Sequence, residues 1–287
     1  RSAYMKQKYS LADGVSKKKN THGVSETFTP KTKLDNYFEE LNRSGYTILR
    51  NVFSKKNCDI AKVKIDQIYK KQIKECGNEK FLYSINDQDV VRALFIYDDF
   101  FIRFINNKNI ISFLNICFGN KFILNLQNSP INRAKQSHYG STWHRDLSYQ
   151  HFVPSRTISL TAIVCLDEFN PKNGGTSILP FSHKFEKFTS KKYINKNEII
   201  VNSKVGDLLI FDSLLFHRAG ANNTSKDRKL IVQVFTLPFI KQQIDYSKAL
   251  NGRYSKEKSL AYILGYDSEI VDSVLQWRKR RKSRFSK

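Results

Sequence analysis

The chain has 287 residues, of which 40% are hydrophobic and 13% aromatic, and its formal net charge at pH 7 is +23. This length and apolar content are enough for a substantial core and suit one large domain or two small ones. No run of eighteen apolar residues is present, so a membrane-spanning helix is not expected.

A charge of +23 raises nucleic acid as a partner, but its distribution weakens that interpretation. Many lysines alternate with Asn and Ile along the whole chain, which indicates compositional bias. Local excesses occur at residues 17–19 and 278–282. We expect solvated basic tails there, with a nonspecific polyanion contact as the alternative, and we do not expect nucleic acid to be the main partner.

The cysteines are scattered and form no CxxC pair: Cys58, Cys76, Cys117 and Cys165. This pattern is typical of free thiols in a reducing compartment. The N-terminal residues also lack the apolar core of a signal peptide. Cytoplasm is therefore the expected location.

The first half of the chain is predicted to be helical. Residues 1–33 are polar and lysine-rich and are expected to form a flexible basic arm. Helical spacing begins at Leu34, with Thr32 or Asp35 as the cap, and ends at Gly45. A β-rich stretch at 46–53 precedes a helix capped by Ser54 and reaching about residue 76. A further helical region spans about 90–117, and its aromatic stripe is expected to be core.

Short β-prone runs follow from residue 121, with turn signals between them. They lie at 122–127, around His144, and at 158–166, 176–179, 199–201, 207–211, 216–219 and 230–237. This pattern predicts a mainly β fold with flanking helices, whose core is a double-stranded β-helix of the jelly-roll or cupin type. The expected domain is 34–240 (helical 34–119, jelly roll 121–238), followed by a helical extension with a basic tail at 241–287.

Two metal-capable residues stand one apart at His144 and Asp146. In a strand, residues i and i+2 project from the same face, so both side chains would point at one place. One imidazole and one carboxylate are two thirds of the facial triad that holds non-haem Fe(II). His217, in another strand-like run, supplies the second imidazole.

Arg228 lies eleven residues beyond His217 and opens an apolar strand. An arginine that points into a barrel needs an anionic partner, because an unpaired buried charge costs several kcal/mol. A carboxylate matches the guanidinium fork best. We therefore expect Arg228 to bind the distal carboxylate of a 2-oxo acid that chelates iron held by His144, Asp146 and His217.

The HxD motif, the distal histidine and the arginine eleven residues later resemble the phytanoyl-CoA dioxygenase family of Fe(II)/2-oxoglutarate oxygenases. Three more segments, at 45–53, 173–184 (NGGTSILPFSHK) and 206–211 (GDLLIF), are similar to this family in the same order. The resemblance covers about residues 34–237. It implies Fe(II), 2-oxoglutarate as co-substrate, and O2.

The resemblance also implies roles for further residues. Gln127, seventeen residues before His144, matches a position that contacts 2-oxoglutarate in related enzymes. The family often has Ser two residues after the distal histidine, but this chain has Ala219, so 2-oxoglutarate binding would be weaker or would rely on another donor such as Thr161. Asp146 is retained, which disfavours the halogenation carried out by relatives that lack this carboxylate.

Other polar residues near the motif have simpler interpretations. His183 is expected to be structural and hydrogen-bonded, and Trp143 to pack beside the metal. Arg145, between the two ligands, is expected to face the other way. His138 and His151 are either substrate contacts or exposed loop residues.

The combined hypothesis is an oxygenase that hydroxylates an aliphatic C–H of a small metabolite, anionic or carrier-linked. Basic loop residues (Arg133, Lys135, Arg156) favour an anionic substrate. Two alternatives remain open. One is a nucleic-acid-acting oxygenase of the same superfamily, although Val234 stands where a second arginine would be expected. The other is a non-catalytic jelly-roll protein that only binds a ligand.

Overall fold

The computed structural model describes residues 10–11, 26–136, 139–147 and 152–285. Most of the expected N-terminal arm lies outside these ranges, as do His138 and His151, so the interpretations placed on those residues are not addressed by the structure. The described residues of the arm include β1 (Ser10–Leu11) and β2 (Glu26–Thr27), which pair with each other.

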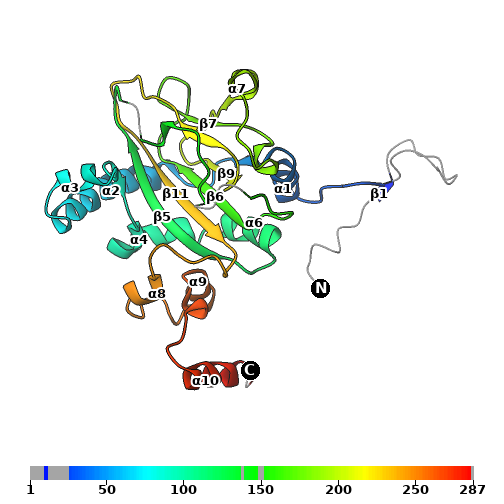
Figure 1. The fold of residues 1–287 in the computed structure, drawn as a ribbon, viewed down its shortest axis with the longest axis vertical. Helices are drawn as coiled ribbons and strands as arrows, with labels where there is room; N and C mark the ends of the chain where they lie inside the picture. Colours follow the sequence, from blue (N-terminus) through cyan, green and yellow to red (C-terminus); the bar gives the residue numbers. More distant parts are fainter. Residues whose placement is uncertain (1–9, 12–25, 137–138, 148–151, 286–287) are drawn as a thin grey trace.

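The centre of the protein is built from two antiparallel sheets (Figure 1). The larger has the order β3-β9-β6-β11-β5-β4: β3 is Tyr46–Leu49, β9 Leu208–Asp212, β6 Ser159–Cys165, β11 Arg228–Thr236, β5 Ile123–Asn132 and β4 Val90–Val91. The smaller has the order β10-β7-β8, with β10 His217–Ala219, β7 Thr176–Ile178 and β8 Ile199–Ile200. Strands distant in sequence pair within each sheet, as expected for the predicted jelly roll.

The helices come mainly from the first half of the chain. They are α1 (Lys33–Ser44), α2 (Lys55–Glu75), α3 (Glu79–Ser84), α4 (Leu94–Tyr97), η2 (Asp99–Phe101), α5 (Ile102–Ile105) and α6 (Lys108–Phe118). The predicted caps are confirmed at Thr32, which forms a capping box with Asp35, and at Ser54. Gly45 ends α1 in the left-handed conformation, with φ 88°.

The two faces of the larger sheet have different partners. One set of strand residues, including Leu160, Ile210 and Phe235, joins the helices in a single core. The alternate residues, including Ile163 and Phe211, face the smaller sheet in a second core. The helices therefore cover one face, and the space between the two sheets lies on the other.

The predicted helical region at 90–117 is wrong as one continuous element. Ala93 adopts a left-handed conformation, with φ 46°, and the chain then forms the short helices α4, η2 and α5 before α6. The prediction that its aromatic stripe is core is confirmed, because Phe95, Phe101 and Phe104 are fully buried. When nearly every side of a segment is buried, its apolar residues show no single helical stripe. The sequence then does not indicate where one short helix ends and the next begins.

The chain after β11 forms α8 (Tyr246–Ala249), α9 (Lys258–Ile263), η5 (Tyr266–Ser268) and α10 (Val274–Phe285). Tyr246 packs edge-on against Phe95, with ring centroids 4.8 Å apart, and the buried face of α9 belongs to the core shared with the helices. By contrast, α10 carries exposed Val274, Leu275 and Trp277. It lies at the opposite end of the molecule from β7 and α7 (Lys191–Asn197) (Figure 1).

Four cysteines occur in the described chain, and all are free, as predicted; Cys58 and Cys165 are buried. Within the residues that the structure describes, no helix has the length and apolarity needed to cross a membrane.

Candidate metal centre

The expected ligands His144, Asp146 and His217 lie together. One ligand atom from each falls within 4.8 Å of the others. The chain around His144 is not the predicted strand but a single antiparallel bridge to His217: each residue's N–H donates to the other's carbonyl oxygen, at 3.0 and 3.1 Å. Directly opposed residues of an antiparallel pair project from one face, which brings the two rings to a centroid separation of 4.3 Å.

Asp146 is placed by the same local geometry. It is two residues beyond His144 and so returns to the same face, and its N–H donates to the carbonyl oxygen of Ser213 at 2.9 Å. Its Oδ1 lies 3.4 Å from Nε2 of His217 and 3.9 Å from Nε2 of His144. The expectation from the HxD spacing therefore holds, although only one bridge of strand is formed.

Both histidines are held in the tautomer that a metal needs. Nδ1 of His144 lies 2.8 Å from the carbonyl oxygen of Thr142, and Nδ1 of His217 lies 3.0 Å from that of Leu215. A carbonyl oxygen only accepts, so each Nδ1 carries the hydrogen and donates it. In the neutral imidazole this leaves the Nε2 lone pair free, and both Nε2 atoms face Asp146.

The charge state of Asp146 also suits a metal ligand. Burial by itself would raise the pKa of this carboxyl, but His217, His144 and the hydroxyl of Thr161 together lower it to about 2. The same carboxylate raises the pKa of His217 against the effect of burial. Burial lowers the pKa of His144, and the neighbouring His217 adds to the shift. At neutral pH Asp146 is therefore ionised and offers a carboxylate between the two rings.

Arg228 stands at the start of β11 with 2% of its surface exposed. Its Nε donates to the carbonyl oxygen of Asn173 at 3.0 Å and its Nη2 to that of Gly174 at 2.8 Å. Among the described residues, the buried Nη1 has no hydrogen-bond partner and no carboxylate forms an ion pair with Arg228. Burial lowers the pKa of Arg228 to about 10, which still leaves it charged at neutral pH.

A cavity of about 130 Å³ connects the triad with Arg228. Its lining comes from both sheets and from the His144 segment: Pro130, Asn132, Gly140, His144, Asp146, Thr161, Ile163, Thr176, His217, Arg218, Ala219, Arg228, Leu230 and Val232. A metal-capable triad at one part of this space and an unpaired buried cation at another are the arrangement expected for a chelating dicarboxylate.

Gln127 does not belong to this cavity. It lies on β5, where Pro130 and Asn132 line the cavity and the alternate residues face the helices. Its amide nitrogen donates to the carbonyl oxygen of Phe101 and to Oε1 of Gln233, each at 3.1 Å. The expectation that Gln127 contacts a co-substrate is therefore corrected, because its side chain forms hydrogen bonds on the face of the sheet that the helices cover.

Thr161 does line the cavity, but its hydroxyl donates to Oδ2 of Asp146 at 2.5 Å. A hydroxyl has one hydrogen to donate, so in this arrangement Thr161 has none left for a ligand carboxylate. Ala219 lines the cavity as well and offers only a methyl group there. The family's serine is therefore not replaced by Thr161.

The residues beside the triad have structural partners. Arg145 faces away from the metal ligands, as expected, and donates to the carbonyl oxygens of Ser182 and Phe185 beneath the ring of Phe216. The ring of Trp143 contacts that of Phe188 in a tilted arrangement, with centroids 6.0 Å apart, and lies beneath the guanidinium of Arg218, 5.0 Å away. Packing of Trp143 beside the metal stays a prediction, since Trp143 is not among the residues that line the metal cavity.

His183 is buried, as a structural residue should be, but its expected hydrogen bond is absent. Neither ring nitrogen has a hydrogen-bond partner among the described residues. The ring instead packs against Gly45, where an added Cβ would come within 2.4 Å of Nδ1 of His183. Burial lowers the pKa of His183 to about 4, with Lys184 and Arg145 adding to the shift.

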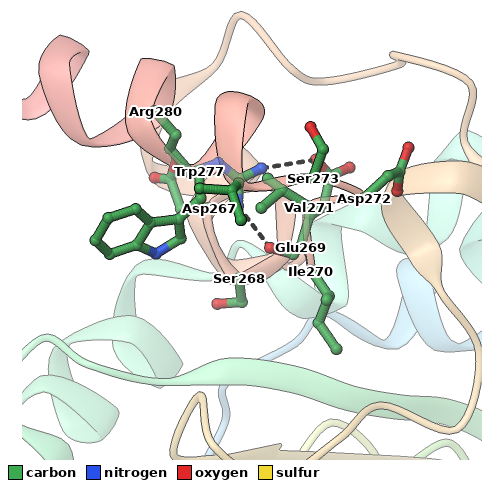
Figure 2. A pocket seen from close by; sticks show the side chains of 10 residues that line it. Asp267, Ser268, Glu269, Ile270, Val271, Asp272, Ser273, Trp277 and Arg280 are labelled. Carbon is green, nitrogen blue, oxygen red and sulfur yellow. Dashed lines mark hydrogen bonds and ion pairs between the residues drawn. The ribbon is translucent and has the colours of Figure 1, made fainter.

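A second and larger hollow, of about 600 Å³, lies at the C-terminal end (Figure 2). Asp267, Glu269 and Asp272 contribute carboxylates there. However, Arg280 pairs with Glu269 at 3.2 Å and also donates to its carbonyl oxygen. The metal-capable cluster found among the described residues is the His144 triad, and this hollow contributes no residue to it.

Sequence reasoning missed two site residues, Ser159 and Ser213. Ser159 donates to the hydroxyl of Ser213 at 2.7 Å, and the Ser213 hydroxyl lies 3.0 Å from that of Thr161. A signal was present: Ser159 and Thr161 place hydroxyls at i and i+2 of an otherwise apolar strand, and so on one face of it. The partner Ser213 follows β9 and has no such pattern.

The chain matches the model of the family "Phytanoyl-CoA dioxygenase (PhyH)" over residues 41–230. An uncharacterized protein of Mycobacterium tuberculosis is 27% identical over 250 residues, covering 85% of this chain and 90% of the relative. The epimerase SnoN, solved with Fe3+, alpha ketoglutarate and nogalamycin RO, has a TM-score of 0.56 at 16% identity, covering 71% of this chain and 84% of SnoN. HygX from Streptomyces hygroscopicus, solved with nickel and 2-oxoglutarate, has a TM-score of 0.56 at 14% identity, covering 74% of this chain and 90% of HygX. At these identities the two structures show a shared fold, and the family match extends over most of the chain: this protein belongs to the phytanoyl-CoA dioxygenase family.

Proposed function

We propose that this protein is an Fe(II)- and 2-oxoglutarate-dependent oxygenase that hydroxylates an aliphatic C–H of a small metabolite. The observation that carries the proposal is the pairing of a preorganised His–Asp–His triad with a buried cation that lacks an anion, in one cavity. SnoN and HygX, which were solved with a metal and the same oxo acid, support it through their fold.

The residues fit Fe(II). Two free Nε2 lone pairs and one carboxylate oxygen form a donor set suited to a non-haem iron and leave other coordination positions for small ligands. Three protein ligands of this kind make a poor structural zinc site, which usually has four. The carbonyl contacts at both Nδ1 atoms fix the rings before any metal arrives.

The residues also fit 2-oxoglutarate. The guanidinium of Arg228 has a buried Nη1 without a partner, and a carboxylate would satisfy it with a charge-assisted hydrogen bond. Leu230 and Val232, on the same face of β11, would pack along the short methylene chain. When bound, Fe(II) and 2-oxoglutarate supply the oxidative decarboxylation that drives oxidation of a substrate C–H.

The substrate is proposed to be a small molecule. Arg133 does not favour an anionic one. The guanidinium of Arg133 pairs with Asp89 at 2.5 Å and with Asp227 at 2.8 Å, so two carboxylates already neutralise it. The nucleic-acid alternative gains no support either. Val234, which is buried opposite Thr161 in the β11–β6 pair, offers only an apolar side chain there, and Arg218 pairs with Glu198 at 2.8 Å.

The proposal is tested by succinate formation from 2-oxoglutarate with added Fe(II) and oxygen. Purified protein is expected to form succinate only when iron is present, and Asp146→Ala is expected to abolish that activity because the remaining ligands lose their carboxylate. Asp272→Ala, which removes an exposed carboxylate in the C-terminal hollow, is the control and is expected to behave as the parent protein. Iron-dependent succinate formation that persists in Asp146→Ala would contradict the proposal.

A further inference from the structure

The two oxygens of Asp146 have different surroundings. Oδ1 faces Nε2 of both His144 and His217. Oδ2 points the other way and accepts a hydrogen bond from the hydroxyl of Thr161 at 2.5 Å. The carboxylate is therefore divided between a metal-facing oxygen and one that the β6 strand holds.

The hydroxyls behind Oδ2 form a chain with a single direction. In the hydrogen bond between Thr161 and Oδ2 of Asp146, the hydroxyl donates and the carboxylate oxygen accepts. Thr161 has then used its one hydrogen, and at the 3.0 Å contact with Ser213 it must be the acceptor. Ser213 in turn receives the hydroxyl hydrogen of Ser159, at 2.7 Å. The donors therefore run from Ser159 to Ser213 to Thr161 to Asp146.

The three hydroxyls of this hydrogen-bond chain are buried. Ser159 is 1% exposed, and Thr161 and Ser213 are 0% exposed, so water does not compete for these hydrogen bonds. Hydrogen bonds in series within a buried site polarise one another in the same direction, which strengthens the last one. β6, which carries Ser159 and Thr161, pairs with β9, where Leu160 lies opposite Asp212. Ser213 follows β9 and donates its own N–H to the carbonyl oxygen of Ser159.

We propose that Thr161 is a positioning residue that holds Oδ2 of Asp146, at the end of the chain Ser159–Ser213–Thr161, so that Oδ1 alone is presented to the metal. This inference rests on the proposed function and assigns Thr161 a role different from binding a co-substrate carboxylate. Without the hydroxyl, Oδ2 loses its partner and the carboxylate is free to rotate about its last bond. Metal binding then has to order a group that the parent protein holds in advance.

The test is metal binding by the full chain without 2-oxoglutarate or oxygen, using Ni(II) affinity and the visible absorption of bound Co(II). Thr161→Val removes the hydroxyl and keeps the branched shape. It is expected to weaken Ni(II) binding by about 10- to 100-fold, the usual effect of losing a partner of a metal ligand. The Co(II) spectrum is expected to change because the carboxylate is no longer restricted to one oxygen.

Three further variants separate positioning from packing. Thr161→Ser keeps the hydroxyl and is expected to restore affinity to within a few-fold of the parent protein. Ser213→Ala leaves Thr161 in place but removes its donor, and is expected to give a smaller loss. Thr47→Val is the matched control: Thr47 is also a buried strand threonine whose hydroxyl donates to a carboxylate, that of Glu40, but it lies on β3 and does not line the metal cavity.

The outcomes are distinct. Normal metal binding and 2-oxoglutarate turnover in the parent protein, with Ni(II) affinity and Co(II) spectrum unchanged in Thr161→Val, would overturn the positioning role and leave the proposed function standing. No metal binding by the parent protein would overturn both. If Thr161→Val fails to fold, Ser213→Ala tests the proposal. A weaker Ni(II) affinity with normal thermal unfolding would support the hydrogen-bond chain, and an unchanged Ni(II) affinity would contradict it.

Discussion

Burial of the Arg228 guanidinium has a free-energy cost that a ligand can offset. The chain buries its guanidinium and satisfies Nε and Nη2 with carbonyl oxygens, but no residue in the described part of the chain hydrogen-bonds to Nη1. Such a charge is costly in the ligand-free protein, because an uncompensated buried ion loses several kcal/mol of hydration. A carboxylate ligand would recover part of that free energy, so stability and co-substrate binding are linked at this residue.

His183 gives a prediction about pH at the same scale. Its pKa is about 4 in the folded protein and about 6.5 in an unfolded chain, so the unfolded state binds more protons between these values. Stability is therefore expected to fall as the pH drops from 6.5, by roughly 2 kcal/mol at pH 5. Urea unfolding of the parent protein and of His183→Asn at pH 7 and pH 5 checks this. An equal pH dependence in the two proteins would contradict the assignment to His183.

At the residue level, the sequence was informative where spacing carries chemistry. The HxD pair, the distal His217 and Arg228 lie around one cavity as expected, because ligand spacing on strands determines which side chains share a face. Gln127 was misplaced because matching it by its distance from His144 ignored strand alternation, and β5 runs further, to Asn132, than the strand expected at 122–127. The hydroxyl partner of Thr161, Ser213, follows β9 and could not be predicted from a local pattern.

At the scale of elements, Gly206 joins the start of β9 to the turn before α2. Its carbonyl oxygen accepts from the N–H groups of Val52 and Phe53, both at 3.0 Å, and its φ is 86°. A Cβ there would lie 2.0 Å from the carbonyl oxygen of Phe53, which is backbone and cannot move aside cheaply. This close approach holds the larger sheet against the helical layer.

Gly206→Ala is therefore expected to destabilise the protein by about 3 kcal/mol or more, combining left-handed strain of about 1–2 kcal/mol with the steric clash. Gly252→Ala is the control, because Gly252 has a φ of 82° but no atom within 4 Å of an added Cβ. Gly252→Ala is expected to lose only the stability that corresponds to left-handed backbone strain. Thermal unfolding of both variants measures the difference, and equal losses would show that the contact with Phe53 is unimportant.

Element prediction succeeded where caps and turns mark the ends. Thr32, Ser54 and Gly45 bound their helices as their residue types indicate, because capping is a local interaction. It failed at 90–117, where the left-handed Ala93 and the short helices after it are set by packing beneath β5 rather than by local sequence. Within residues 139–147, the strand expected around His144 is reduced to a single bridge with His217.

At the scale of the whole molecule, the jelly roll places the triad between two sheets and the helices on the far side. The run of short strands predicted this architecture, but not that β3 from the first half of the chain would pair with β9. Such pairing joins residues about 160 positions apart, beyond the range of any local pattern. The net charge of +23 did not indicate the site either, because the proposed co-substrate contact depends on one buried cation, Arg228, in the cavity.

The measurement that tests the central claim most directly is an anaerobic titration of Fe(II)-loaded protein with 2-oxoglutarate, following the visible charge-transfer band of the chelate. The parent protein is expected to develop the band. Arg228→Met, which keeps the bulk of the side chain and removes its charge, is expected to need about 10- to 100-fold more 2-oxoglutarate. Arg103→Met, which changes an exposed arginine outside the cavity, should titrate as the parent does. A folded, iron-loaded parent protein that gives no band, or a band equally strong in Arg228→Met at the same concentrations, would contradict the account.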